Sequence, residues 1–223
     1  MPDNQLIGLA TDFFQNSLDT SPTSAIMRGH KQYLDQIEQL TEDQFEREEE
    51  IVDSFIKRLN AIDQNQLTNR EKVTHGMLEF ALSSNKDSLL DRSWEFGAGV
   101  AGFTGFLIDY NQQMFVPDSE SADMMLKRLE LYKRLYTQIA DVQKVGLNNN
   151  RVATERNLLR TIDQLENYLA SSLDQDPLLL VNFSPEISDS EISEWKDKAK
   201  NIIEVNIRPT VSAYLDQLKT EHL

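Results

Sequence analysis

WEFGAGVAGFTGFLIDYNQQMFV, residues 94–116, is the stretch around which the rest of the chain is expected to fold. Four of the chain's eight glycines lie in it, and they alternate with large apolar side chains that include Phe96, Phe103 and Phe106. Glycine has no Cβ and lets backbones approach closely, while aromatic rings bring large apolar areas. We therefore expect this Gly/Phe-rich segment to be buried, with the flanking helices packed around it.

The same stretch contains a glycine spacing that is typical of nucleotide-binding loops. Residues 97–102, GAGVAG, have the G-x-G-x-x-G pattern, which cradles a pyrophosphate when it stands between a strand and a helix of a βαβ unit. Here residues 68–92 have helical spacing, with an inward apolar face expected to consist of Val73, Met77, Phe80 and Ala81, and no β-branched run precedes the glycines. The context favours close packing of a glycine-rich segment over dinucleotide binding.

Amphipathic helices are predicted on both sides of this segment. Capping-box spellings begin at Thr41, Thr68 and Ser188. Apolar residues recur at helical spacing in residues 6–18, 22–28, 42–62, 69–92, 119–146, 151–171 and 189–218. We expect an all-α fold of antiparallel helices around the buried Gly/Phe-rich segment, in which residues 119–171 form a long central αα-hairpin. Residues 1–223 are expected to form a single helical domain.

Glycine and proline predict where several of these helices begin, end or break. Pro22 suits the first position of a helix capped by Ser21, and Gly29 suits the left-handed position after it. Gly146 is expected to end the helix that starts near residue 119. Pro209 leaves two possibilities open, a kinked helix or two helices end to end. Residues 176–183 read as an extended connector, or as a short strand with no obvious partner.

Composition excludes some classes of partner. The formal charge of -15 and the sequence pI near 4.6 argue against nucleic acid and against an anionic membrane surface, because both would repel the chain. No run approaches the roughly 18 apolar residues of a membrane-spanning helix. The N-terminus shows no secretory signal, so a soluble protein is expected and the cytoplasm is the favoured compartment. The absence of cysteine leaves no disulfide framework and no thiolate metal site.

Two groups of residues rich in glutamate have side chains of the kind that bind metal ions. Glu71, His75 and Glu79 are four residues apart and would line up on one helix face, so a metal site is conceivable, although an ordinary exposed polar face is the favoured interpretation. The acidic run at residues 46–50 points to several sides of a helix and is expected to be a solvated face.

Motifs for catalysis are missing from this sequence. H-E-x-x-H, G-x-S-x-G and the phosphate-binding G-x-x-x-x-G-K-[ST] do not occur, and the three histidines, His30, His75 and His222, are far apart in sequence. We expect no catalytic, cofactor-binding or metal-binding residue in the chain. The residues best placed to line a cleft are in or near the Gly/Phe-rich segment: Trp94, Phe103, Asp109 and Tyr110.

The order of these features resembles the N-terminal half of the bacterial family of unknown function 885. The features that carry the resemblance are Phe13-Phe14, Asp19-x-x-Pro22-Thr23 with Gly29-His30, the glycine-rich segment before Asp109, Arg128-Leu129, Gly146 with Arg151-Val152, and Ile203-x-x-x-Ile207-x-Pro209-x-x-x-x-Tyr214-Leu215. They span almost the whole chain, but they are diffuse helix-packing features.

The resemblance implies a part of a zinc metallopeptidase-like, mostly helical protein. In such a protein the H-E-x-x-H helix and the zinc ligands lie in a C-terminal half, so no cofactor is expected in this chain and no catalytic residue is carried over to it. The chain would shape or cover a substrate cleft. Its expected partner is that C-terminal half, or a second copy bound through an exposed apolar face. The alternative from another class is a stand-alone helical binding or scaffold protein without enzymatic activity.

Overall fold

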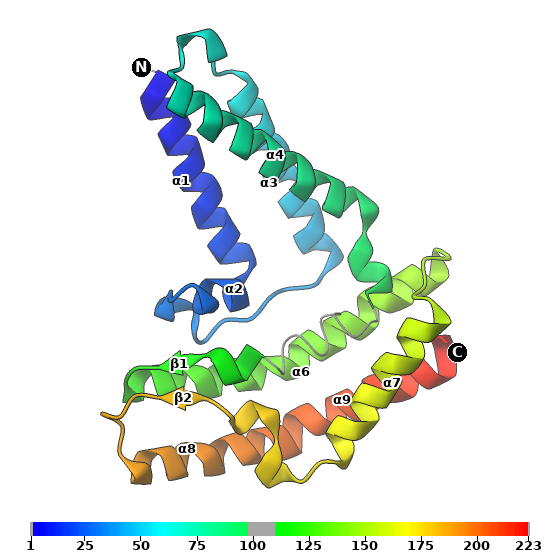
Figure 1. Ribbon diagram of the computed structural model, residues 1–223. Helices are drawn as coiled ribbons and strands as arrows, with labels where there is room; N and C mark the ends of the chain where they lie inside the picture. The colour runs from blue at the N-terminus through cyan, green and yellow to red at the C-terminus, as the bar shows by residue number, and fades with distance from the viewer. Residues whose placement is uncertain (1, 98–109, 223) are drawn as a thin grey trace. The chain divides into compact units, whose positions relative to one another are not determined.

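The computed structural model describes residues 2–97 and 110–222, which are helical for most of their length, and the predicted all-α fold is confirmed (Figure 1). These residues divide into two compact units. Unit 1 contains Met1–Thr20 and Leu40–Ser93, and unit 2 contains Ser21–Gln39 and Trp94–Leu223. Each unit is described separately, and the single domain expected over residues 1–223 stays a prediction.

Unit 1 is built from α1 (Pro2–Thr20), α3 (Glu42–Asn60) and α4 (Asn69–Asp91), which pack against one another. Its core is aliphatic apart from one aromatic ring, and consists of Leu6, Leu9, Val52, Phe55, Leu59, Ile62, Leu67, Leu78 and Leu82. The capping box predicted at Thr41 forms only in part, since the Thr41 side chain accepts from the Gln44 amide without a reciprocal bond, whereas Thr68 and Glu71 form a complete capping box. Both helices therefore begin where the sequence indicates.

Helix α4 buries a different face from the one predicted. Val73, Met77 and Phe80 were expected to face inward, but they are 63%, 68% and 75% exposed. The buried residues are His75, Leu78 and Leu82. The prediction that His75 lies on an exposed polar face is therefore wrong. The helix carries two apolar stripes, and α1 and α3 cover only the one that contains Leu78 and Leu82.

Unit 2 is organised around α6 (Ser119–Asn148), the longest helix of the described residues. It packs against α8 (Asp189–Ile202), against the π-helical turns Ile203–Ile207 and against α9 (Arg208–Gln217). Helix α7 (Glu155–Ala170) follows α6 after a short connection, which is the connectivity predicted for the αα-hairpin, but it packs mainly on α9 rather than on α6. Further short helical pieces are α2 (Pro22–Met27), η1 (Lys31–Tyr33), η3 (Ser93–Phe96), η4 (Asn111–Gln113), η5 (Leu173–Gln175), η6 (Pro177–Leu179) and η8 (Leu218–His222).

A two-residue parallel pairing joins the chain before α6 to the chain before α8. Strand β1 (Phe115–Val116) pairs with β2 (Asn182–Phe183), with Phe115 opposite Asn182 (Figure 1). The Asn182 amide donates to the Met114 carbonyl at 3.1 Å, and the Ser184 amide donates to the Val116 carbonyl at 2.9 Å. The connector at residues 176–183 thus ends in a short strand whose partner was not foreseen.

Two predicted helix boundaries change. Helix α6 does not end at Gly146 but continues to Asn148, and the left-handed residue after it is Asn150, at φ 56°. Helical structure continues from α8 into α9 through Pro209, because residues 203–207 form wider π-helical turns directly before it. Wider turns accommodate a proline that cannot donate a backbone hydrogen bond. The predicted left-handed Gly29 is confirmed at φ 89°.

Most of the Gly/Phe-rich segment lies outside the described residues, and so do Phe103, Phe106 and Asp109. Its predicted burial stays a prediction there. At its described start, Trp94 is partly buried, Glu95 is buried and Phe96 is 38% exposed. Tyr110, at the other end, is partly buried.

Candidate functional site

The start of the Gly/Phe-rich segment is fixed to the C-terminal end of α6. Glu95 is 2% exposed, and its Oε2 atom lies 3.4 Å from Nη1 of Arg151. A Cβ atom added to Gly146 would lie 2.3 Å from the Glu95 carbonyl oxygen and 2.8 Å from that of Arg151. Only glycine permits this approach without a backbone shift. Glu95, Gly146 and Arg151 together form what we call the segment anchor.

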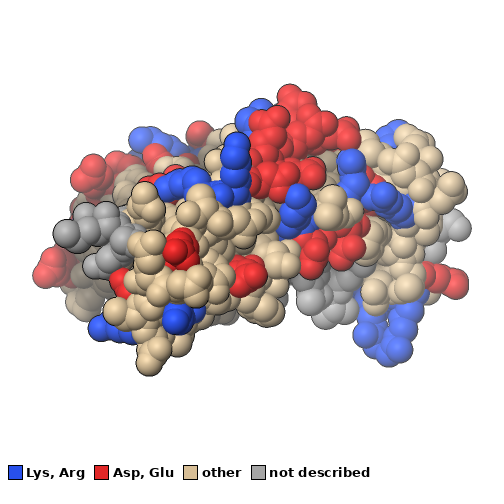
Figure 2. All heavy atoms as spheres, turned by 90° about the horizontal axis from the view of Figure 1, so that it is seen from above, with Lys and Arg blue, Asp and Glu red and all other residues tan. Residues whose placement is uncertain are grey.

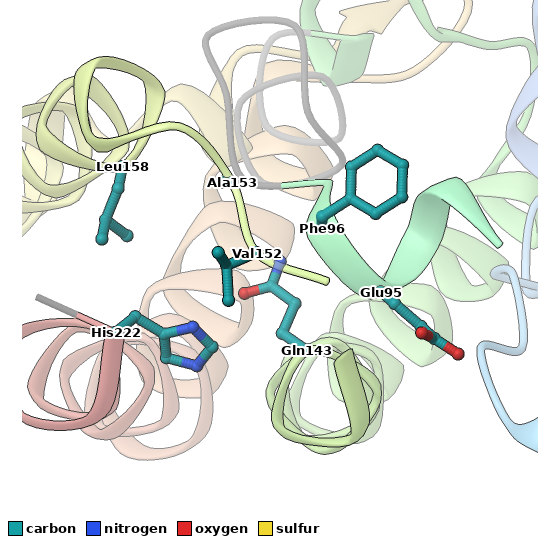
Figure 3. A pocket seen from close by; sticks show the side chains of 7 residues that line it. All are labelled: Glu95, Phe96, Gln143, Val152, Ala153, Leu158 and His222. Carbon is teal, nitrogen blue, oxygen red and sulfur yellow. The ribbon is translucent and has the colours of Figure 1, made fainter. Parts of the chain in front are cut away.

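A small polar cavity opens beside the segment anchor (Figure 3). Its volume is only about 10 Å³, and its lining comes from η3, α6, the chain before α7, α7 itself and η8: Glu95, Phe96, Gln143, Val152, Ala153, Leu158 and His222. The Gln143 side chain is held from behind, since its Oε1 accepts a 2.8 Å hydrogen bond from the Tyr214 hydroxyl. The cavity has room for about one water molecule and none for an organic ligand.

His222 is the titratable ring nearest to this cavity, and burial lowers its pKa. Its buried Nε2 atom has no hydrogen-bond partner among the described residues. In Figure 3 the His222 ring lies near Val152 and Gln143, whereas the Glu95 carboxylate points away from it. The two groups are therefore not arranged as a paired acid and base.

The predicted cleft-lining residues are placed only in part. Trp94 and Tyr110 are partly buried, and Phe103 and Asp109 lie outside the described residues, so the predicted cleft itself stays a prediction. The sequence did not indicate that Glu95 and Arg151 belong to the site, and it predicted Gly146 to end a helix instead of contacting Glu95. A glycine within a long apolar helical stripe was the available signal for a close backbone approach.

The conceivable metal group on α4 is not assembled. His75 is 4% exposed and its Nδ1 atom lies 4.0 Å from Oε2 of Glu79, while the Glu71 carboxylate accepts from the Thr68 amide at 2.6 Å in the capping box. Within residues 2–97 and 110–222, no three His, Asp or Glu side chains converge as a metal ion would require. In the acidic run on α3, Glu46 and Glu50 are exposed as expected, whereas Glu48 and Glu49 are partly buried, and burial raises the pKa of Glu48.

A buried polar network links the chain around α2 to α6. Arg128 is fully buried, and its guanidinium donates to the Thr23 hydroxyl at 2.5 Å and to the Gln36 carbonyl. Glu38 accepts from the Thr23 amide at 2.9 Å and from its hydroxyl at 2.7 Å. Thr23 and Arg128 both belong to the features that carry the family resemblance, and here they hold the fold together.

A second buried polar group fixes the chain after α7 to α9. The Asp176 carboxylate has no exposed surface; its Oδ2 lies 3.0 Å from Nη2 of Arg208, and its Oδ1 accepts from the Leu178 amide at 3.1 Å. The Arg208 guanidinium also lies over the Tyr168 ring, 5.4 Å from its centroid. Such fully paired charges stabilise one arrangement of the chain and leave no free acid for chemistry.

A larger hollow, of about 240 Å³, lies between the N-terminal ends of α6 and α8. It is lined by apolar and aromatic side chains with charged ones among them: Ser119, Ala122, Asp123, Leu126, Phe183, Ile187, Glu191, Glu194, Trp195 and Lys198. The Phe183 and Trp195 rings meet edge to face with centroids 5.2 Å apart. The Trp195 indole Nε1–H donates to the Ala122 carbonyl at 2.8 Å, which fixes the ring against α6. We call this feature the α6–α8 hollow.

Acidic side chains dominate the electrostatics of the surface. The chain has 37 Asp and Glu residues against 22 Lys and Arg residues, and Figure 2 shows the acidic ones gathered in patches on the visible face. This excess attracts cations and repels anions. In the described part of the chain, no helix has the length and apolar character needed to span a membrane.

Comparison with known proteins identifies the family of this chain. A search of curated proteins finds no match for the chain. The model of the family described as "bacterial protein of unknown function (DUF885)" matches residues 22–223, which include all of unit 2 except Ser21. A match over this much of the sequence shows membership, so the chain belongs to this bacterial family of unknown function.

Proposed function

We propose that this chain is a non-catalytic helical domain that shapes or covers the substrate cleft of a zinc metallopeptidase-like protein. In this proposal the zinc and the catalytic residues belong to a C-terminal half, and the chain contributes the walls of the cleft. The metallopeptidase-like character rests on the resemblance described above. Among the described residues, the buried charged groups Arg128 and Asp176 are paired within the fold, and no group of side chains converges as metal ligands would.

The segment anchor is the observation that carries the proposal. A loop can position substrate only if its base is fixed, because binding groups must be held to within a fraction of an ångström. Glu95 and the backbone packed on Gly146 provide such a base within the stretch expected to line the cleft, directly after Trp94. Phe96, 38% exposed, directly follows Glu95 and lines the small cavity, so it is a described side chain that could touch a substrate in the assembled protein.

A stand-alone binding or scaffold protein is the second candidate, and a specific observation favours it. Val73, Met77 and Phe80 form an exposed apolar stripe at i, i+4 and i+7 on α4. Exposed apolar patches commonly mark surfaces that bind another protein. In this alternative the occupant is a second copy of the chain, and the substitution Phe80→Ser should convert an associated species to a monomer in light scattering.

Experiments on the whole protein encoded by the reading frame distinguish the two proposed functions. The leading proposal expects an H-E-x-x-H segment after residue 223, about one zinc per chain in the whole protein, and no bound zinc or peptide hydrolysis in residues 1–223 alone. In the whole protein, Phe96→Ser should raise KM for a peptide and leave the zinc content unchanged. Phe115→Ser, which changes a 56% exposed ring on β1, is the matched control and should leave KM unaltered.

A reading frame without H-E-x-x-H would refute the metallopeptidase proposal and leave the scaffold alternative. One tightly held zinc in residues 1–223 would refute the division of labour between the two halves. Equal KM values for Phe96→Ser and the unaltered whole protein would remove Phe96 from the cleft.

A further inference from the structure

We propose that the α6–α8 hollow binds a small organic cation, a protonated amine on an apolar body about as large as one aromatic side chain. This site goes beyond the proposed function. It uses the first turns of α6, whereas the segment anchor uses the last ones. Ala122 and Gly146 are separated by roughly 36 Å along the helix, at about 1.5 Å per residue. Binding at one end can therefore be tested without altering the other.

The size and floor of the hollow set the apolar part of the ligand. An apolar cavity of about 150 Å³ is large enough for benzene. At about 240 Å³, the hollow has room for a ring with a short chain. Leu126, Phe183 and Ile187 supply aliphatic and aromatic contacts, and Trp195 is held in place by its hydrogen bond to Ala122. A fixed floor of this kind favours a rigid apolar body, since little side-chain freedom is lost on binding.

The charged side chains that line the hollow determine whether it attracts a cation or an anion. Three carboxylates, those of Asp123, Glu191 and Glu194, line the hollow together with one ammonium, that of Lys198. Lys198 is 2.7 Å from Glu194 and neutralises it. Asp123 and Glu191 then leave an excess of two negative charges. A cation is attracted to this rim, and an anion of the same shape is repelled.

Glu191 is a pre-oriented acceptor on this rim. Its Oε2 accepts from the Ser188 amide at 3.0 Å and from the Ser188 hydroxyl at 2.6 Å, and its Oε1 accepts from the Ser119 hydroxyl at 2.8 Å. These hydrogen bonds lower the pKa of Glu191, so the group stays ionised at neutral pH. A carboxylate has about four lone-pair positions, and three are used, which leaves one on Oε1 for an N–H donor.

Phenethylammonium is the probe that matches this chemistry, and Trp195 provides the readout. The chain has two tryptophans, so an ¹⁵N-labelled sample has two indole N–H signals, and Trp94→Phe assigns them. Phenethylammonium should shift the Trp195 signal saturably, with a Kd at or below about 10 mM at low salt. Phenethyl alcohol, of the same shape without the charge, should bind at least about threefold more weakly, since an exposed ion pair contributes up to about fivefold.

Two isosteric variants on the same helix distinguish the effect of a charge in the hollow from the effect of lowering the net negative charge of the whole chain. Asp123→Asn removes a carboxylate from the hollow and should weaken binding of phenethylammonium by about two- to fivefold. Asp141→Asn removes another exposed carboxylate farther along α6 and should leave the Kd unchanged. Raising the salt concentration should weaken binding to the unaltered chain and narrow the gap between it and Asp123→Asn.

Three results would overturn the proposal. They are an unshifted Trp195 signal at about 10 mM phenethylammonium, equal affinity for the alcohol and the ammonium, and equal weakening by Asp123→Asn and Asp141→Asn. A hollow-filling variant, Leu126→Trp, tests the location: it should abolish the saturable shift, and retained binding would place the ligand elsewhere. Far-ultraviolet circular dichroism of each variant confirms that the helices are intact.

Discussion

Replacing Gly146 by alanine should destabilise unit 2, although alanine is the better helix former. In a helix interior, glycine to alanine contributes about 1 kcal/mol of stability. Against this, the new Cβ would lie 2.3 Å from the Glu95 carbonyl oxygen and 2.8 Å from both the Arg151 carbonyl oxygen and the Glu95 Cβ. Two of these neighbours are backbone atoms, so relief requires η3 or the chain after α6 to move.

The cost of such overpacking is about 1–3 kcal/mol, and three simultaneous contacts place Gly146→Ala at the upper end. Subtracting the gain in helix propensity leaves a net loss of about 2 kcal/mol. For a chain of this size, that corresponds to a fall of roughly 4–8 °C in Tm. The displacement also loosens the Glu95–Arg151 pair, so the segment anchor and the fold should weaken together.

Urea denaturation followed by tryptophan fluorescence measures this effect, because Trp94 and Trp195 both belong to unit 2. Gly76→Ala in α4 is the matched control: nothing lies within 4 Å of its added Cβ, and it should stabilise unit 1 by up to about 1 kcal/mol when unfolding is followed by circular dichroism. A Gly146→Ala chain as stable as the unaltered one would refute the close approach of Glu95 to α6.

Three further predictions concern other residues of the two units. Asp176→Ala leaves the Arg208 guanidinium, only 18% exposed, without its carboxylate; it should cost about 3 kcal/mol in urea denaturation, whereas Asp174→Ala, at an exposed ion pair, should change stability little. Thr68→Ala removes the capping box of α4 and should lower the unfolding free energy by about 1 kcal/mol, measured by circular dichroism. Burial raises the pKa of Glu48, so its protonated form is favoured in the folded state; this stabilisation is complete below about pH 4.5 and is lost as pH rises through the folded pKa. Glu48→Gln should therefore be more stable than the unaltered chain at pH 7 and equally stable near pH 4, and a constant difference across this range would contradict the assignment.

Local sequence signals predicted the helices well, because caps and breaks act over a few residues. The capping boxes at Thr68 and Ser188 form as written, and Gly29 takes its left-handed conformation. Such features depend on hydrogen bonds and backbone sterics within one turn. They need no knowledge of which elements pack together.

The same local signals do not show which face of a helix is buried. Helix α4 has apolar residues on two sides, and periodicity alone does not say that Leu78 and Leu82 meet α1 and α3 while Met77 and Phe80 face outward. Burial of His75 follows from that choice and was missed with it. The side that is buried depends on the neighbours, which lie far away in the sequence.

Contacts between distant short segments were also beyond sequence reasoning. Strands β1 and β2 have two residues each and are separated by the whole of α6 and α7, so neither has a readable pattern of its own. The segment anchor depends on Gly146 meeting Glu95, and a glycine there is equally typical of a helix end. For the candidate site, the sequence pointed to the region around Trp94 but not to the residues that fix it.

The order in which the chain visits its two units has a consequence for synthesis on the ribosome. Residues 21–39 lie between the two parts of unit 1, yet Gln36 receives its hydrogen bond from Arg128, 92 residues later. At about 5–20 residues per second, these residues wait roughly 5–20 s for α6 to be made. Unit 1 is complete in sequence at Ser93 and can fold during that interval. The nascent chain then holds the Thr23 hydroxyl and the Gln36 carbonyl without the Arg128 guanidinium that donates to both, which makes this interval the one in which a chaperone has most to protect.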